Sequence, residues 1–164
     1  MGILTPSKTP PTKQRAVVLV VLAIGLLAGS WFLSGPTETG TILVTFPSGA
    51  TLETEVADTP EKLFFGLAFR ESLPPDTGML YIFDTSDRHK VRTKAFTFPV
   101  DVIWANESRH VVHLVERAQP CEQDPCPAYG PPPVNARYVI ETEAGFIQRE
   151  RLSTGAELKF TLKL

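Results

Sequence analysis

The chain has 164 residues, 43% of them hydrophobic, and a formal net charge of −2. This length fits one domain, and a domain of this size buries roughly two-thirds of its unfolded surface, so it folds without a metal cluster. Residues 1–36 carry three basic residues and no acid, which leaves the rest of the chain at −5. Binding to nucleic acid needs clustered Lys and Arg, so we expect no nucleic-acid partner.

An uncharged apolar run of 18 residues spans 16–33. As a helix it would be about 27 Å long, close to the hydrocarbon thickness of a bilayer. The basic residues lie in 1–15, which predicts a cytoplasmic N-terminus and an exported remainder. We therefore expect a single-pass anchor in the cytoplasmic membrane, a linker at 34–40 and a periplasmic or extracellular domain at 41–164. The alternative is a cleaved signal peptide, with a cut near Ala28-Gly29-Ser30, and it also exports the domain.

The first predicted elements of the domain are two strands and a helix. Strands are expected at 41–46 and 52–56, joined by a turn at Pro47-Ser48-Gly49. A helix should follow from Asp58 or Thr59 as its cap, with Pro60 at its first position. Its apolar residues are Leu63, Phe64, Leu67 and Ala68, which would share one face.

Short apolar runs separated by turn signals follow the helix, and we predict a strand for each of them. They span residues 79–83, 91–98, 100–105, 110–116, 136–141 and 157–164. Asn106-Glu107-Ser108-Arg109 should form a hairpin turn between two of them. The pattern predicts a mostly β single domain, an antiparallel β-sandwich or jelly-roll-like fold with one short helix.

Residues 117–135 interrupt this pattern, with six of the 15 prolines and both cysteines. Nineteen residues is long for a loop in a compact domain. Outside the cytoplasm a cysteine pair is oxidised, so we expect a disulfide between Cys121 and Cys126 that stiffens the loop. The alternatives are redox catalysis and metal binding. Redox pairs usually have two intervening residues rather than four, and structural zinc needs four nearby ligands.

Asp101 is the most informative acid, because residues 98–104 are apolar on both faces of a predicted strand. A carboxylate buried there must be paired, accept hydrogen bonds or stay protonated. We favour a structural Asp, which pairs with a basic side chain or accepts backbone N–H groups, over a catalytic acid–base group. The basic residues considered as partners are Arg70, Arg92, Lys94 and Arg137.

Other candidate residues belong to two further hypotheses. A hydrolase-like site would combine Asp101 with Asp84 or His89 and a basic partner such as Arg70. An aromatic platform for a sugar or a peptide would use three residues with planar rings. These are Trp104, Tyr129 and Tyr138.

The sequence predicts neither a metal nor a cofactor. His110 and His113 are three apart on a predicted strand, so they point to opposite faces and cannot readily chelate one metal. Nucleotide-binding glycine loops, a nucleophile elbow and a zinc-protease motif are all missing from the sequence.

Three segments together resemble the bacterial and archaeal family called domain of unknown function 192 (DUF192). They read FPSGATLETEVADTPEKLFFGLAFRESLPPDTGMLYIFD, FPVDVIWAN and PCEQDPCPAYGPPPVNARYVIE. The resemblance covers nearly all of residues 42–164 and implies a compact, mostly β fold of sandwich or jelly-roll type. It implies no activity, because none is assigned to the family.

The chain departs from this resemblance in two places. Relatives commonly read FWMKNT where residues 91–96 read VRTKAF, and Lys94 is the one match, which makes it a candidate binding residue. Phe64-Phe65 stands where relatives are more polar. This pair suggests an additional apolar contact with a partner or with the membrane surface.

We therefore expect a membrane-anchored extracytoplasmic domain that acts as a binding or interaction module. Its partner would be an envelope protein or a glycan, and the absence of a catalytic motif argues against an enzyme. Two alternatives remain. One is a hydrolase-like envelope enzyme built on Asp101, and the other is a passive structural domain without a ligand.

Overall fold

The computed structural model describes residues 17, 19, 20, 22 and 40–163. The predicted membrane segment at 16–33 lies almost entirely outside these residues, as do the basic N-terminus and most of the linker. Among the residues described, no helix is long and apolar enough to cross a membrane.

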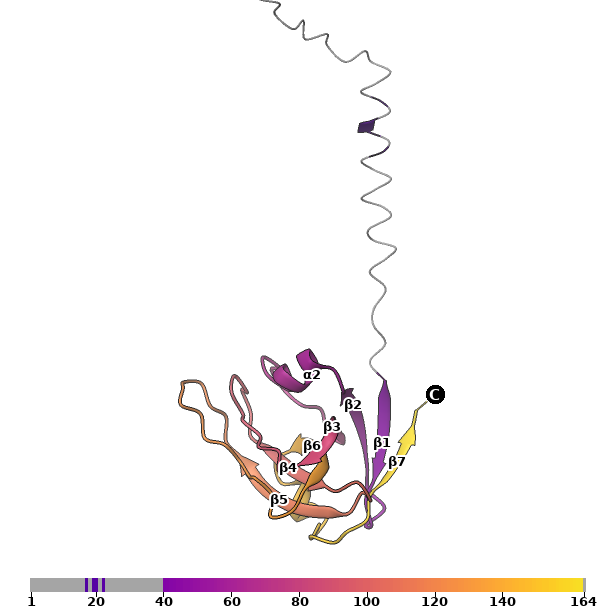
Figure 1. Ribbon diagram of the computed structural model, residues 1–164, viewed down its shortest axis with the longest axis vertical. Helices are drawn as coiled ribbons and strands as arrows, with labels where there is room; N and C mark the ends of the chain where they lie inside the picture. Colours follow the sequence, from indigo (N-terminus) through magenta and orange to yellow (C-terminus); the bar gives the residue numbers. More distant parts are fainter. Residues whose placement is uncertain (1–16, 18, 21, 23–39, 164) are drawn as a thin grey trace, which may run out of the picture. The chain divides into compact units, whose positions relative to one another are not determined.

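The domain is built on one sheet, and seven strands are described in it (Figure 1). Along the chain they are β1 (Thr41–Thr45), β2 (Thr51–Ala57), β3 (Thr77–Asp87), β4 (Val100–Ala105), β5 (Val111–Ala118), β6 (Ala136–Glu143) and β7 (Lys159–Leu162). Their order in the sheet is β5-β4-β6-β3-β2-β1-β7. The mostly β prediction is confirmed, and all but one of the predicted strands are present.

The arrangement differs from the predicted antiparallel sandwich, because the strands form a single mixed sheet. β2 and β3 run parallel, with Glu55 opposite Met79, and the other neighbours are antiparallel. Parallel neighbours cannot be joined by a tight turn and need a crossover connection. Residues 58–76 make that crossover, and they contain the short helix α2 (Pro60–Phe65).

Helix α2 begins as predicted but ends early. The Thr59 side chain accepts a hydrogen bond from the Lys62 N–H, and Pro60 is the first helical residue. The helix ends at Gly66, whose φ of +50° is a left-handed conformation that favours glycine. A Cβ at Gly66 would lie 1.9 Å from the Tyr81 hydroxyl, so any other residue at this position would clash with Tyr81. Because the helix stops, Phe64 does not share the buried face of Leu67 but is 82% exposed.

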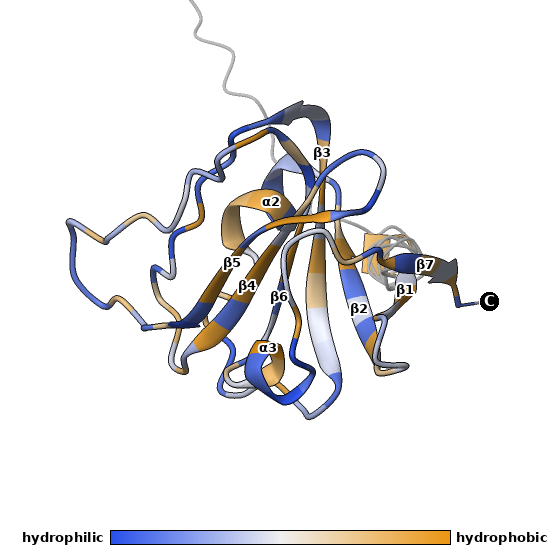
Figure 2. Ribbon diagram, turned by 90° about the horizontal axis from the view of Figure 1, so that it is seen from below, coloured by the Kyte–Doolittle hydropathy of each residue, from blue (hydrophilic) through white to orange (hydrophobic). Residues whose placement is uncertain are grey.

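Apolar side chains cover both faces of the sheet. On one face the core includes Leu80, Ile103 and Ile140, and it packs against a second short helix, α3 (Phe146–Arg149). On the other face it includes Tyr81, Trp104 and Val139, and it packs against residues around α2 and the segment before β4. Figure 2 shows α2 and α3 toward opposite ends of the strands. The central strands are therefore covered on both sides.

The predicted strand at 91–98 is wrong. The segment forms only isolated bridges, from Val91 to Tyr129 and from Lys94 to Cys121. Ala95 has a φ of +60°, which breaks an extended run, and Pro99 follows and has no N–H for a sheet ladder. The predicted hairpin turn at 106–109 is confirmed, since the Arg109 N–H donates to the Asn106 carbonyl at 2.9 Å between β4 and β5.

Candidate functional site

A cavity of about 430 Å³ lies between α2, β3, β6 and the segment before β4. This is within the range of cavities that hold small molecules in proteins. Its lining is mostly apolar, and aromatic side chains are prominent in it. The aromatic residues are Phe64, Phe65, Phe69, Tyr81, Phe83 and Phe96.

One carboxyl group, that of Glu141, lines this apolar cavity. Its side chain is fully buried on β6, and Oε2 accepts a hydrogen bond of 2.5 Å from the Tyr81 hydroxyl. Among the described residues, no hydrogen-bond donor to Oε1 is found, and Glu141 is one of the residues that line the cavity. Loss of hydration on burial raises the pKa of Glu141 to about 7, against the opposing effect of the Tyr81 hydrogen bond. The carboxyl group can therefore hold or release a proton near neutral pH.

Tyr81 is fixed as a hydrogen-bond donor to Glu141. Burial, and next the nearby Glu141 carboxylate, raise the pKa of Tyr81 well above its ordinary value, so the phenol stays neutral. A neutral phenol has one proton to donate, and the Tyr81 proton is directed to Oε2 of Glu141 at 2.5 Å.

The sheet register places both residues on the cavity side. On β6, Glu141 lies between Val102 of β4 and Met79 of β3. The neighbouring Gly78 permits this close approach, since a Cβ there would lie 2.6 Å from the Glu141 carbonyl oxygen. The carboxyl group is thus held by three paired strands rather than by a loop.

Three phenylalanines form the mouth of the cavity, and we call them the aromatic rim: Phe64, Phe65 and Phe69. They are 82%, 51% and 73% exposed, respectively. Phe65 contacts the other two rings, with centroid distances of 5.1 Å to Phe64 and 6.3 Å to Phe69. A cluster of exposed rings of this kind marks a contact surface more often than isolated apolar residues do.

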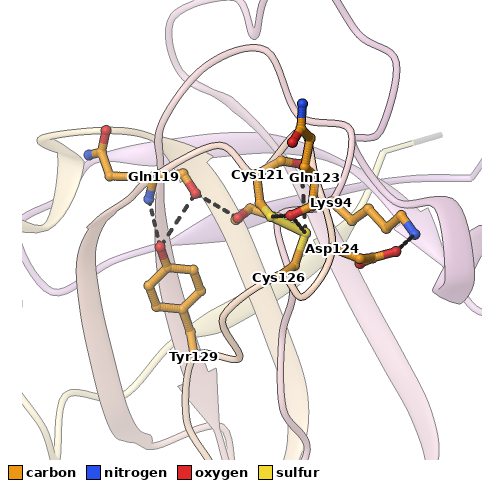
Figure 3. The surroundings of a disulfide bond; sticks show 8 residues. Lys94, Gln119, Cys121, Gln123, Asp124, Cys126 and Tyr129 are labelled. Atoms are coloured by element: carbon orange, nitrogen blue, oxygen red, sulfur yellow. Dashed lines mark hydrogen bonds and ion pairs between the residues drawn. A yellow bond between two sulfur atoms is a disulfide. The ribbon is translucent and has the colours of Figure 1, made fainter.

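Residues 90–96 form the opposite wall, and basic side chains extend from it at Lys90, Arg92 and Lys94. All three are exposed, and Lys94 forms an ion pair with Asp124 (Figure 3). Residues 91–96 of this wall are the segment that differs from the pattern expected from the family resemblance.

The segment at residues 117–135, here called the cysteine loop, contains both cysteines and is hydrogen-bonded to this wall. Cys121 and Cys126 form the predicted disulfide, and the Tyr129 hydroxyl accepts a hydrogen bond from the Gln119 N–H at 2.8 Å (Figure 3). The Ala95 N–H donates to the Cys121 carbonyl at 3.0 Å. Backbone hydrogen bonds between Val91 and Tyr129 attach the wall a second time.

Asp101 is fully buried and has the structural role that we favoured. Its Oδ1 accepts from the Arg117 N–H at 2.8 Å, and its Oδ2 accepts from the Gly145 and Ile147 N–H groups at 3.0 and 2.8 Å. It thereby ties β4 to the start of α3. None of the basic side chains considered as partners forms a described ion pair with it.

The hydrolase-like combination is not assembled. Asp101 lies opposite Thr142, which lies opposite Gly78, six residues before Asp84 on β3. At about 3.3 Å per residue, Asp101 and Asp84 are about 20 Å apart along the sheet. This is far beyond hydrogen-bond reach.

The other two members of that combination have partners of their own. His89 stacks on Phe83 with a ring distance of 3.7 Å, and its Nε2 lies 3.0 Å from the Thr85 carbonyl oxygen. Arg70 makes two hydrogen bonds to Glu55, at 2.6 and 2.7 Å. These contacts account for both side chains structurally.

The predicted aromatic platform is also not assembled. Trp104 is fully buried and donates from Nε1 to the His89 carbonyl at 2.9 Å. Tyr138 packs in the core on the opposite face of the sheet, against Phe160. Tyr129 lies on the Trp104 side, so the three rings do not share a surface.

Sequence reasoning missed Glu141 and Tyr81, and of the predicted site residues only Lys94 lines the cavity. Within residues 40–163, no group of three or more His, Cys, Asp or Glu could hold a metal ion. The site is an apolar cavity with one buried carboxyl group, and its chemistry is that of ligand binding or proton transfer.

The fold and the cavity define a small, mostly β domain with a central mixed sheet. The profile of DUF192, a family described as an uncharacterized ACR, matches residues 43–160, and the chain belongs to this family. No curated protein matches the chain.

Two crystal structures share the fold. A Sinorhizobium meliloti protein, named as a candidate transcription regulator, is 25% identical with a TM-score of 0.63, over 74% of this chain and 92% of its own. A protein of unknown function from Novosphingobium aromaticivorans is 22% identical with a TM-score of 0.63, over 76% of this chain and 89% of its own.

Proposed function

We propose that this domain is a binding module and that its ligand enters the cavity beside α2. The observation that carries the proposal is the buried Glu141 carboxyl group at a mostly apolar cavity of about 430 Å³. Buried polar groups are normally satisfied by partners, and an apolar pocket with a few placed polar groups is the usual form of a ligand site. The ligand would combine an apolar body with a polar group that meets Glu141.

The aromatic rim supports the same proposal. Exposed phenylalanine rings are unfavourable in water, and covering them with a ligand or a partner surface is favourable. The rim borders the cavity directly, so one bound molecule can contact both the rings and the interior. The Phe64-Phe65 pair, which is unusual for the family resemblance, thus contributes to the mouth of the site.

A cavity-filling variant tests the proposal. Ala68 lines the cavity, so Ala68→Phe should occupy part of it, whereas Val134→Phe adds the same ring at an exposed position outside it. Small apolar compounds would be screened by thermal unfolding of the wild type and both variants. Ligands should raise the midpoint of the wild type and of Val134→Phe but not of Ala68→Phe. The proposal fails if compounds raise all three midpoints alike or raise none.

We also propose that the module is held outside the cytoplasm by a membrane anchor at residues 16–33. The uncharged run behind a basic N-terminus supports this location. A reporter enzyme that is active only outside the cytoplasm would be fused behind Leu164. Activity of the fusion is the expected result, and a fusion that is made at full length but is inactive would refute the anchor.

Acid–base catalysis at Glu141 is the second candidate function. Its pKa of about 7 is suited to proton transfer near neutral pH, and this observation favours Glu141 over the earlier candidate Asp101. A ligand found in the screen would be incubated with the protein and recovered. If the wild type changes the ligand chemically and Glu141→Gln does not, catalysis at Glu141 is established. If the ligand is recovered unchanged, the domain is a binding module without this catalysis.

A further inference from the structure

We infer that the cavity binds a small apolar amine, whose ammonium group is held at the free oxygen of Glu141. This inference rests on the proposed function, because it names the ligand class of the same site. It follows from Oε1 of Glu141, for which the described residues supply no hydrogen-bond donor, and from the mostly apolar walls of the cavity.

The hydrogen-bond pattern at Glu141 selects a donor. Tyr81 donates its phenolic proton to Oε2 at 2.5 Å. Oε1 is therefore the atom that a ligand would meet. An ionised carboxylate only accepts hydrogen bonds, so the complementary ligand group is a donor.

The burial of the carboxylate selects a charged donor. A fully buried anion is unfavourable unless it is paired, and a hydrogen bond between two charged groups is stronger than a neutral one. An ammonium group supplies both the charge and the proton. Aromatic rings such as those of Phe83 and Phe96 also attract a cation through their faces.

The exposed basic residues of the wall do not oppose this arrangement. The charge of Lys94 is offset by Asp124, while Lys90 and Arg92 are exposed and their field is screened by salt. The interior of the cavity is governed by Glu141, which is buried and weakly screened.

Three water-soluble probes with the same phenyl body separate the possible ligand classes. They are 2-phenylethylamine, 2-phenylethanol and 3-phenylpropanoate. Equilibrium dialysis against the full-length protein in lipid nanodiscs, with empty nanodiscs as the blank, gives each dissociation constant. At pH 8 the amine should bind at least about tenfold more tightly than the alcohol, and the carboxylate should bind most weakly.

Matched variants connect this selectivity to one side chain. Glu141→Gln has nearly the same shape and should reduce amine affinity at least about tenfold while preserving alcohol binding. Preserved alcohol binding shows that the variant is folded with an intact cavity. Glu143→Gln makes the same chemical change further along β6, outside the cavity lining, and should leave all three affinities unchanged.

Amine affinity should also depend on pH. Glu141 changes from mostly protonated at pH 6 to mostly ionised at pH 8, so wild-type affinity for the amine should rise about tenfold over this range. The other titratable or charged groups near the cavity are Tyr81, Glu55, Arg70, His89, Lys90, Arg92 and Lys94. His89, which stacks on Phe83, is the one histidine in this group. Glu141→Gln should therefore remove the increase in amine affinity between pH 6 and pH 8. An increase that persists in this variant would come from another titratable group and would overturn the inference.

The outcomes distinguish this inference from the proposed function. Equal binding of amine and alcohol, or an amine affinity that Glu141→Gln does not change, would overturn the amine and keep the cavity as a binding site. If none of the probes binds the wild type, the inference fails. The proposed function then depends on the separate screen with Ala68→Phe.

Discussion

Replacing Glu141 with Gln should change how the stability of the protein depends on pH. In the unfolded chain this carboxyl group titrates near its ordinary value of 4.5, whereas burial raises the folded-state pKa to about 7. Between these values the folded protein keeps a proton that the unfolded chain has released, so stability falls as pH rises. Gln has no such proton, and the variant should lack this contribution.

The size of the effect follows from the gap between the two pKa values. At about 1.4 kcal/mol per pH unit, a change from 4.5 to about 7 corresponds to about 3 kcal/mol. The stabilising contribution is fully present below pH 4.5, decreases up to pH 7 and is absent at higher pH. The wild type should therefore lose about 3 kcal/mol relative to Glu141→Gln across this interval.

Urea unfolding of the full-length protein, kept in nanodiscs to accommodate the proposed anchor, measures this loss at several pH values from 4.5 to 8. The free energies of unfolding of wild type and Glu141→Gln are compared at each pH, with Glu143→Gln as the control for a lost carboxylate outside the cavity. A difference between wild type and Glu141→Gln that varies by less than about 0.5 kcal/mol over this range would refute the reasoning. It would mean that Glu141 is solvated in the folded protein.

Three further substitutions test other parts of the domain by urea unfolding. Asp101→Ala leaves one buried and two part-buried N–H groups without their acceptor and should lower the free energy of unfolding by about 3 kcal/mol; a loss below about 1 kcal/mol would contradict its structural role. Glu55→Gln breaks a half-exposed pair with Arg70 and should lower it by at most about 1 kcal/mol at pH 7. Because the Arg70 hydrogen bond lowers the pKa of Glu55, this loss should disappear as pH falls through that pKa, and a loss that persists in acid would have another origin. Replacing Cys121 and Cys126 with Ser opens a short ring and should lower stability by about 2 kcal/mol without reductant; two free thiols in the intact mass of native wild type would exclude the disulfide.

The strands were predictable where the sequence alternates and the chain has no local obstacle. In β2, the buried Leu52, Thr54 and Val56 alternate with polar residues, and the structure keeps this pattern. Residues 91–98 are as apolar as a strand, but Ala95 takes a left-handed conformation and the wall pairs with a loop distant in sequence. Such pairing is a tertiary effect that local periodicity does not contain.

The site was not predictable from local pattern, because Glu141 has the sequence context of a solvated residue. Tyr138, Ile140 and Thr142 point to one face of the strand, and Glu141 points to the other face together with Arg137. Two charged residues on one face are typical of the solvent-exposed side of a strand. The structure buries this face because β6 lies between β3 and β4 and the cavity wall covers it. Some of these contacts join residues sixty or more positions apart, such as Tyr81 and Glu141. Asp101 was placed correctly because its neighbours are apolar on both faces.

The cysteine loop is attached to the cavity wall at Cys121 and at Tyr129, and its tip between these points is not attached to the wall by any backbone hydrogen bond of the described residues. Cys121 and Tyr129 hold the cavity wall through backbone hydrogen bonds, whereas residues 122–125 are exposed. Insertions or foreign epitopes placed at this tip should leave the pocket shape intact, while a one-residue deletion beside either attachment should shift the wall. The tip is thus a suitable place for an affinity tag or a fluorescent label that reports on the protein without blocking its mouth.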